Sequence, residues 1–147
     1  MNIQRRSLSL AFGLVLAAGI AAVASYAELP RTASTEGAKL YFISPKNGET
    51  LSGSVVVRFG LTGMGVAPAG VANPGTGHHH LIVDAPLPPL NLPIPKDANH
   101  LHFGSGQTET VLELAPGEHT LQLVLADTNH VPHDPPVVSE QIRITVK

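Results

Sequence analysis

Residues 119–125 read His-Thr-Leu-Gln-Leu-Val-Leu, with leucine at every second position from 121 onward. Successive side chains of a strand point to opposite faces of a sheet, so this pattern predicts a β-strand with one apolar face. The same period of two occurs at residues 54–61 and 141–146, and shorter strands are expected at 39–43, 79–84 and 108–114. No window has convincing helical periodicity, so we expect an all-β protein.

Proline and glycine mark turns between these strands, as in Ser-Pro-Lys-Asn-Gly at 44–48 and Ala-Pro-Gly-Glu at 115–118. Six or seven short strands joined in this way predict one immunoglobulin-like antiparallel β-sandwich over residues 39–147. The small and polar residues 28–38 are expected to form an N-terminal tether. Two long loops, 64–77 and the proline-rich 86–95, flank histidines and are expected to carry function.

The N-terminus has the features of a signal peptide spanning residues 1–27. Arg5 and Arg6 precede an apolar run from Leu8 to Val23, and Ser-Tyr-Ala at 25–27 is a small-x-small cleavage site. The run is shorter than the ~20 residues that span a bilayer, so a retained anchor is the lesser alternative. We expect a periplasmic or secreted protein with no membrane span after cleavage, exported by either the general or the twin-arginine route.

Composition excludes several classes of protein. The chain has no cysteine, which rules out disulfides, thiolate zinc sites, blue-copper centres and cysteine nucleophiles. Removing Arg5 and Arg6 from the nine Lys and Arg leaves seven against eleven Asp and Glu, a net charge of −4 for the mature chain. Without a basic run, binding to nucleic acid is disfavoured.

All eight histidines lie between residues 78 and 133. Neutral imidazole is a common ligand of transition metals, and two histidines at positions i and i+2 of a strand share one face about 7 Å apart. The sequence therefore predicts a copper or zinc site. The core of its predicted ligand set is two histidine pairs, His78 with His80 and His100 with His102. A loop is expected to add His130 or His133.

Each group also has a structural interpretation. One ring of the run 78–80 could be packed and hydrogen-bonded while the others are exposed, because Leu81-Ile82-Val83 does not show which face is buried. His100 and His102 could be exposed polar positions. In the loop 129–136, Asn129, His130 and Asp134 could bond the backbone, or His133 and Asp134 could supply a ligand and a supporting carboxylate. We expect His119 to be a hydrogen-bonded histidine at the margin of the core.

Four stretches together resemble the bacterial family DUF4399, a domain of unknown function: residues 77–84, 100–109, 116–123 and 127–136. The resemblance covers roughly residues 38–147 and implies an exported compact β-domain without naming an activity. A weaker resemblance links residues 100–104, His-Leu-His-Phe-Gly, to copper–zinc superoxide dismutase, another β-sandwich. The chain departs from that family because it lacks the disulfide, the zinc-loop ligands and the active-site arginine.

Two functions remain open from the sequence. The first is an exported metal-binding protein for copper or zinc, acting in carriage or tolerance. The second is a non-catalytic interaction module, in which structural or pH-responsive histidines support contact with an envelope protein. An enzyme is the third and least favoured class, because the chain has no nucleophile elbow and no P-loop. Catalysis would require a bound metal with an open coordination position.

Overall fold

The computed structural model describes residues 30–147, which form nine β-strands and no helix. The strands are β1 (Lys39–Ser44), β2 (Thr50–Leu51), β3 (Val55–Thr62), β4 (Gly65–Val66), β5 (Thr76–Val83), β6 (His100–Phe103), β7 (Glu109–Leu112), β8 (Gly117–Ala126) and β9 (Ile142–Val146). In this part of the chain no helix could cross a membrane. The predicted signal peptide, residues 1–27, lies outside the described residues.

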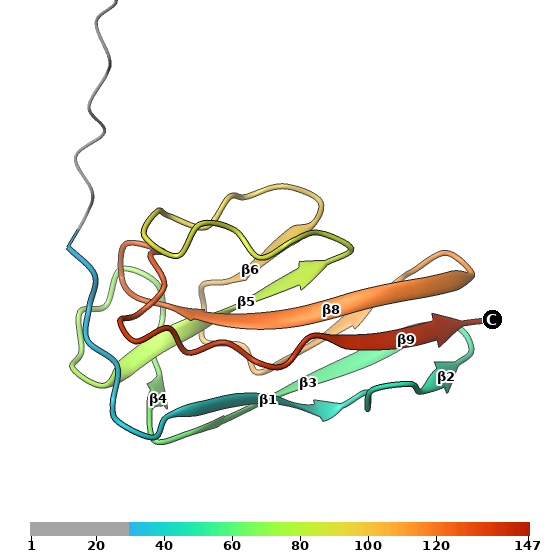
Figure 1. Cartoon of the computed structure of the whole chain (residues 1–147), viewed down its shortest axis with the longest axis horizontal. Helices are drawn as coiled ribbons and strands as arrows, with labels where there is room; N and C mark the ends of the chain where they lie inside the picture. The colour runs from blue at the N-terminus through green and yellow to red at the C-terminus, as the bar shows by residue number, and fades with distance from the viewer. Residues whose placement is uncertain (1–29) are drawn as a thin grey trace, which may run out of the picture.

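The strands form two sheets that face each other (Figure 1). The smaller sheet is antiparallel, with the order β1-β3-β7. The larger has the order β2-β9-β8-β5-β4, and β6 also pairs with β5. Strand β8 pairs along one edge of β5. Along the other edge, β4 pairs with the beginning of β5 and β6 with the residues that follow. Strand β5 is therefore an interior strand, and its pairing places the histidine run inside the larger sheet.

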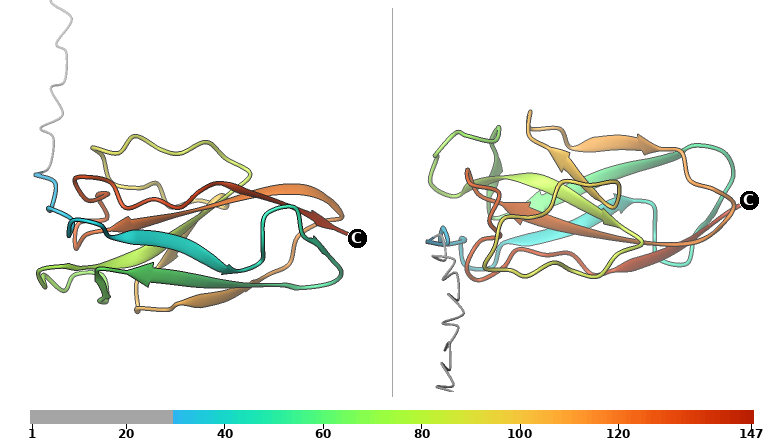
Figure 2. Two further views of the ribbon diagram at one scale, coloured as in Figure 1. Left: turned by 60° about the horizontal axis from the view of Figure 1, so that its bottom comes forward. Right: turned by 90° about the horizontal axis from the view of Figure 1, so that it is seen from above.

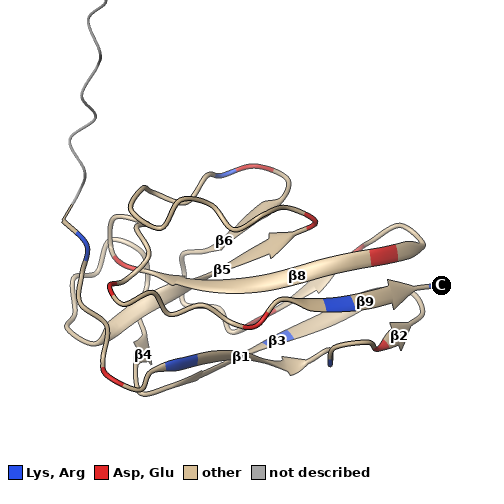
Figure 3. Cartoon of the chain, in the orientation of Figure 1, with Lys and Arg blue, Asp and Glu red and all other residues tan. Residues whose placement is uncertain are grey.

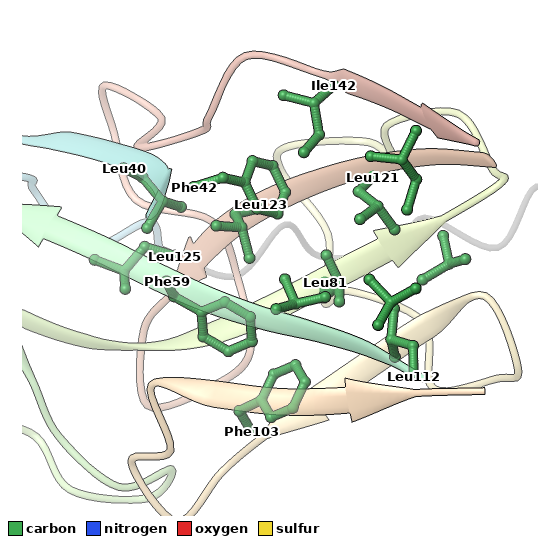
Figure 4. Close-up of a cluster of buried hydrophobic side chains, with 14 of the residues drawn as sticks. Leu40, Phe42, Phe59, Leu81, Phe103, Leu112, Leu121, Leu123, Leu125 and Ile142 are labelled. Atoms are coloured by element: carbon green, nitrogen blue, oxygen red, sulfur yellow. The ribbon is translucent and has the colours of Figure 1, made fainter. Parts of the chain in front are cut away.

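The main core lies between the two sheets (Figure 2). Leu121, Leu123 and Leu125 of β8 are fully buried, and Figure 4 shows them facing the side chains of the smaller sheet. Phe59 and Phe103 meet edge to face with ring centroids 4.8 Å apart. A fully buried leucine contributes about 2 kcal/mol of transfer free energy, so this leucine row is a main source of stability.

The outer face of the larger sheet is covered as well. Ile82, Val124 and Ala126 form a second apolar cluster with Ile94, which belongs to the loop at residues 84–99. Every residue from 77 to 83 is consequently buried. Charged side chains lie mainly on loops and strand ends, and β5 and β6 carry none (Figure 3). The three histidines of β5 therefore lie in a region of low polarity.

The predicted all-β sandwich is confirmed, and each of the six predicted strands corresponds to a strand of the structure. The immunoglobulin-like topology stays a prediction. Strands β2 and β4 have two residues each, too few for a sequence pattern to show. In the described part of the segment expected as a tether, Ala33 forms a parallel bridge with Asp134 and so lies against the domain.

Candidate metal centre

Strand β5 divides the three consecutive histidines between its two faces. His78 lies opposite Ala126 and His80 opposite Val124, so both rings point to the outer face of the larger sheet. His79 points to the inner core, where its ring centroid is 5.1 Å from that of Phe59. At most 1% of each residue is exposed. The alternative that some of these rings are exposed is therefore wrong, because both faces of β5 are covered.

Strand β6 adds a third histidine to the outer face. His102 lies opposite His80 in the antiparallel ladder, and their ring centroids are 5.0 Å apart. Gly104 leaves room for this ring, because a Cβ atom there would lie 2.2 Å from His102 Cε1. His100 lies two residue pairs further along the ladder, opposite Ile82, and the structure does not bring it into the same cluster.

A loop supplies the fourth ring, that of His130. The Asp127 Oδ1 atom accepts hydrogen bonds from the backbone N–H groups of Asn129 and Val131, at 2.8 and 3.1 Å. The His130 N–H donates to the Asp127 carbonyl at 3.0 Å, and His130 adopts a left-handed φ of 65°. This turn places the ring centroid of His130 4.8 Å from that of His102 and 5.0 Å from that of His78.

The four rings form a compact cluster. Their six centroid distances are 4.9, 5.0, 5.0, 5.0, 6.0 and 4.8 Å, for the pairs 78–80, 78–102, 78–130, 80–102, 80–130 and 102–130. A square would have two diagonals about 40% longer than its sides, as in the tetragonal sites of Cu(II). Five of the six distances lie between 4.8 and 5.0 Å and only one is longer, at 6.0 Å, so the ring centroids are closer to a tetrahedral than to a square arrangement.

The nitrogens of three rings converge further. His78 Nε2 and His80 Nε2 are 3.0 Å apart, and one potential ligand atom from each of His78, His80 and His102 lies within 4.8 Å of the others. In residues 30–147 this is the single group of three or more His, Asp or Glu side chains so arranged. Tetrahedral ligation at about 2.05 Å would separate the nitrogens by about 3.3 Å.

The cluster is built for uncharged rings. Burial, and after it the charges of neighbouring histidines, lowers the pKa of His80 to about 2 and that of His78 to about 4. Burial and the nearby His130 also lower the pKa of His102. Each ring therefore keeps a free lone pair at neutral pH. Two of their nitrogens, His80 Nδ1 and His102 Nε2, are buried without a hydrogen bond to any described residue.

The remaining histidines have partners outside the cluster. His100 Nδ1 is 2.8 Å from Asp97 Oδ1. His119 lies between Asp84 Oδ2 and the Ala115 carbonyl, at 2.6 and 2.8 Å, which matches the expected structural role. The buried His133 faces two backbone carbonyls, at 3.3 and 3.2 Å. The structure therefore brings together the rings of four of the six histidines predicted as ligands, with the ring nitrogens of three of them converging, and it places His100 and His133 apart from them.

The match to a known protein family covers most of the described residues. Residues 57–147 match the family named Domain of unknown function (DUF4399). The chain belongs to this family. No curated protein matches it, and neither does any solved structure. The four clustered histidines all lie in the DUF4399 region, and the similarity to superoxide dismutase stays an analogy drawn from sequence.

The centre of this DUF4399 domain offers nitrogen ligands only. Imidazole suits zinc, copper and nickel, whereas calcium and magnesium require oxygen. Structural zinc sites have four tetrahedral ligands, and here the ring nitrogens of three histidines converge. Sequence reasoning did not identify two residues that shape the centre, Gly104 and Asp127. The sequence signal that could have identified Asp127 is the short Asp-x-x-His spacing from Asp127 to His130, which is compatible with a turn that carries a histidine.

Proposed function

We propose that this DUF4399 protein is an exported metal-binding protein that holds one zinc or copper ion among His78, His80, His102 and His130. One observation carries the proposal: four rings from β5, β6 and a loop meet with every pair of centroids between 4.8 and 6.0 Å apart. Burial lowers the pKa values of His78 and His80, so these rings disfavour a proton but can bind a cation through their lone pairs.

The arrangement of the rings favours zinc over copper. Zinc has no geometric preference from its d-electrons and is held tetrahedrally at sites of four protein ligands. Cu(II) prefers a tetragonal plane, which the near-tetrahedral cluster does not match. Copper remains the second candidate because imidazole binds it more tightly than zinc at equal geometry. Burial of His78 and His80 favours retention of the ion, in carriage or tolerance within the envelope.

The test is the metal content of the full exported protein, purified without a tag, followed by calorimetric titration with Zn(II) and Cu(II). We expect one ion per chain, with zinc retained in the tetrahedral site. The double variant His80→Ala, His102→Ala should lose this ion. A matched control, His100→Ala with His119→Ala, removes two histidines outside the cluster and should retain it. Binding that survives in the first variant, or no stoichiometric binding by the wild type, refutes the proposal.

A second candidate is a non-catalytic interaction module. It is favoured by four exposed apolar side chains of the smaller sheet, on the face turned away from the core: Tyr41, Ile43, Val56 and Val111. The same titration distinguishes the two functions. A wild-type protein that binds no ion would leave this candidate, with the histidines as structural or pH-responsive groups.

A further inference from the structure

The segment that precedes β1 is fastened to the loop that carries His130. Thr32 Oγ1 donates to Asp127 Oδ2 at 2.7 Å. The Ser34 N–H donates to the Asp134 carbonyl and the Asp134 N–H donates to the Thr32 carbonyl, both at 3.0 Å. In Figure 1 this segment is drawn in blue beside the loop that follows β8. We call residues 31–35 the strap.

Arg31 is the second attachment of the strap. Its Nε donates to the Pro132 carbonyl at 3.2 Å, and an Nη atom donates to the His133 carbonyl. Its other Nη atom lies 3.1 Å from Asp134 Oδ1, and the side chain is 22% exposed. One guanidinium thus holds the loop at three consecutive residues. A planar group with several donors in a fixed geometry restrains both position and orientation.

The His130 loop requires such a restraint. A residue other than glycine in the left-handed region costs about 1–2 kcal/mol, so the φ of 65° at His130 persists only if its surroundings hold it. Asp127 organises the turn through Oδ1 and bonds the strap through Oδ2. By contrast, His78, His80 and His102 lie in the ladder of β5 and β6, where no strap residue takes part.

We propose that Arg31 and Thr32 are positioning residues for His130 and that the strap thereby sets the coordination number of the metal centre. This inference rests on the proposed function. With the strap docked, His130 completes a four-histidine site. With the strap released, the three strand histidines still bind the ion, and its fourth position opens to water or to an exogenous anion. The strap lies outside the matched residues 57–147, so the DUF4399 region alone would supply the three-histidine form.

Cobalt spectroscopy of the full exported protein tests this proposal. Co(II) replaces zinc in tetrahedral sites, and its visible absorption bands report the ligand set. We expect Arg31→Ala with Thr32→Val to give the spectrum of His130→Ala, together with metal loss at least about tenfold faster than in the wild type. Arg58→Ala is the matched control, because it removes an arginine ion pair with Glu109 on the smaller sheet. It should keep the wild-type spectrum.

Hydrogen exchange in the metal-free protein gives a second measurement. The His130 and Val131 amides donate to Asp127, and the strap variant should exchange them faster while the β5 amides stay protected. A strap variant that melts earlier but keeps the wild-type cobalt spectrum and metal release would overturn the proposal and leave the proposed function intact. A wild type that binds no stoichiometric cobalt would overturn both.

Discussion

The histidine cluster has a thermodynamic consequence that a single substitution reveals. His102 lies opposite His80, and its Nε2 is buried without a hydrogen bond to any described residue. Leucine has a similar volume and no polar atom. We expect His102→Leu to make the metal-free protein more stable, because the substitution removes an unsatisfied group and breaks no hydrogen bond.

The size of the effect follows from the burial of that nitrogen. A buried polar group without a partner costs about 1–3 kcal/mol, and His102→Leu should raise the free energy of unfolding by this amount. For a domain of roughly 110 residues this corresponds to about 4 °C in Tm for each kcal/mol. The lowered pKa of His102, caused first by burial, keeps the ring neutral in the reference state.

Zinc should reverse the order of the two stabilities. At free zinc about 1,000 times the dissociation constant, binding raises the free energy of unfolding of the wild type by about 4 kcal/mol. This rise is larger than the stabilisation that His102→Leu gives to the metal-free protein. The variant has lost one ligand and gains less. Urea unfolding, followed by circular dichroism with a chelator and then with buffered zinc, measures both differences.

The control is the same substitution at a histidine whose two ring nitrogens are hydrogen-bonded. His119→Leu breaks the contacts to Asp84 and Ala115 and should cost about 1–3 kcal/mol with or without zinc. If His102→Leu destabilised the metal-free protein as much as His119→Leu does, the cluster would carry no cost in the absence of a metal. The reasoning would then be refuted.

Two further predictions concern other parts of the domain. Hydrogen bonds to Asp84 and then to the Ala115 carbonyl raise the pKa of His119. The resulting stabilisation is complete below about pH 6.5 and is lost as the pH rises through the raised pKa. Asp84→Asn should therefore lower Tm more at about pH 5.5 than at about pH 8.5, and an NMR titration of the His119 ring that shows no fall in pKa would contradict this assignment. Gly77→Ala should destabilise the protein by about 1–3 kcal/mol in urea unfolding, because a Cβ atom would lie 2.7 Å from the Ala126 carbonyl oxygen. Gly65→Ala, whose nearest contact is Thr76 Cγ2 at 3.3 Å, is the control and should cost less; equal losses would rule out the steric explanation.

Local sequence pattern predicted the strands because alternation is a property of the strand itself. Leu121, Leu123 and Leu125 are buried as their spacing required. The same reasoning could not show which face of β5 is buried, because Leu81-Ile82-Val83 is apolar at each position. The structure resolves this ambiguity physically: the smaller sheet covers one face, and the loop containing Ile94 covers the other.

The histidine cluster depended on information that spacing does not contain. His100 and His102 share a face, but only His102 lies opposite His80, because strand register decides which pairs meet. His130 joins the cluster through a turn organised by Asp127, and His133 turns to backbone carbonyls instead. Residue types therefore predicted the candidate ligands, whereas register and turn geometry selected among them.

Burial of β5 on both faces links the fold to the proposed chemistry. A strand covered on one side could bury His79 or its two neighbours, but not all three. Here His78 and His80 occupy outer-face positions beside Ile82 and Val124, where apolar side chains would cost no desolvation. Buried polar rings at positions suited to apolar side chains indicate a functional requirement rather than a folding one. A metal ion held by the converging ring nitrogens of His78, His80 and His102 would meet that requirement.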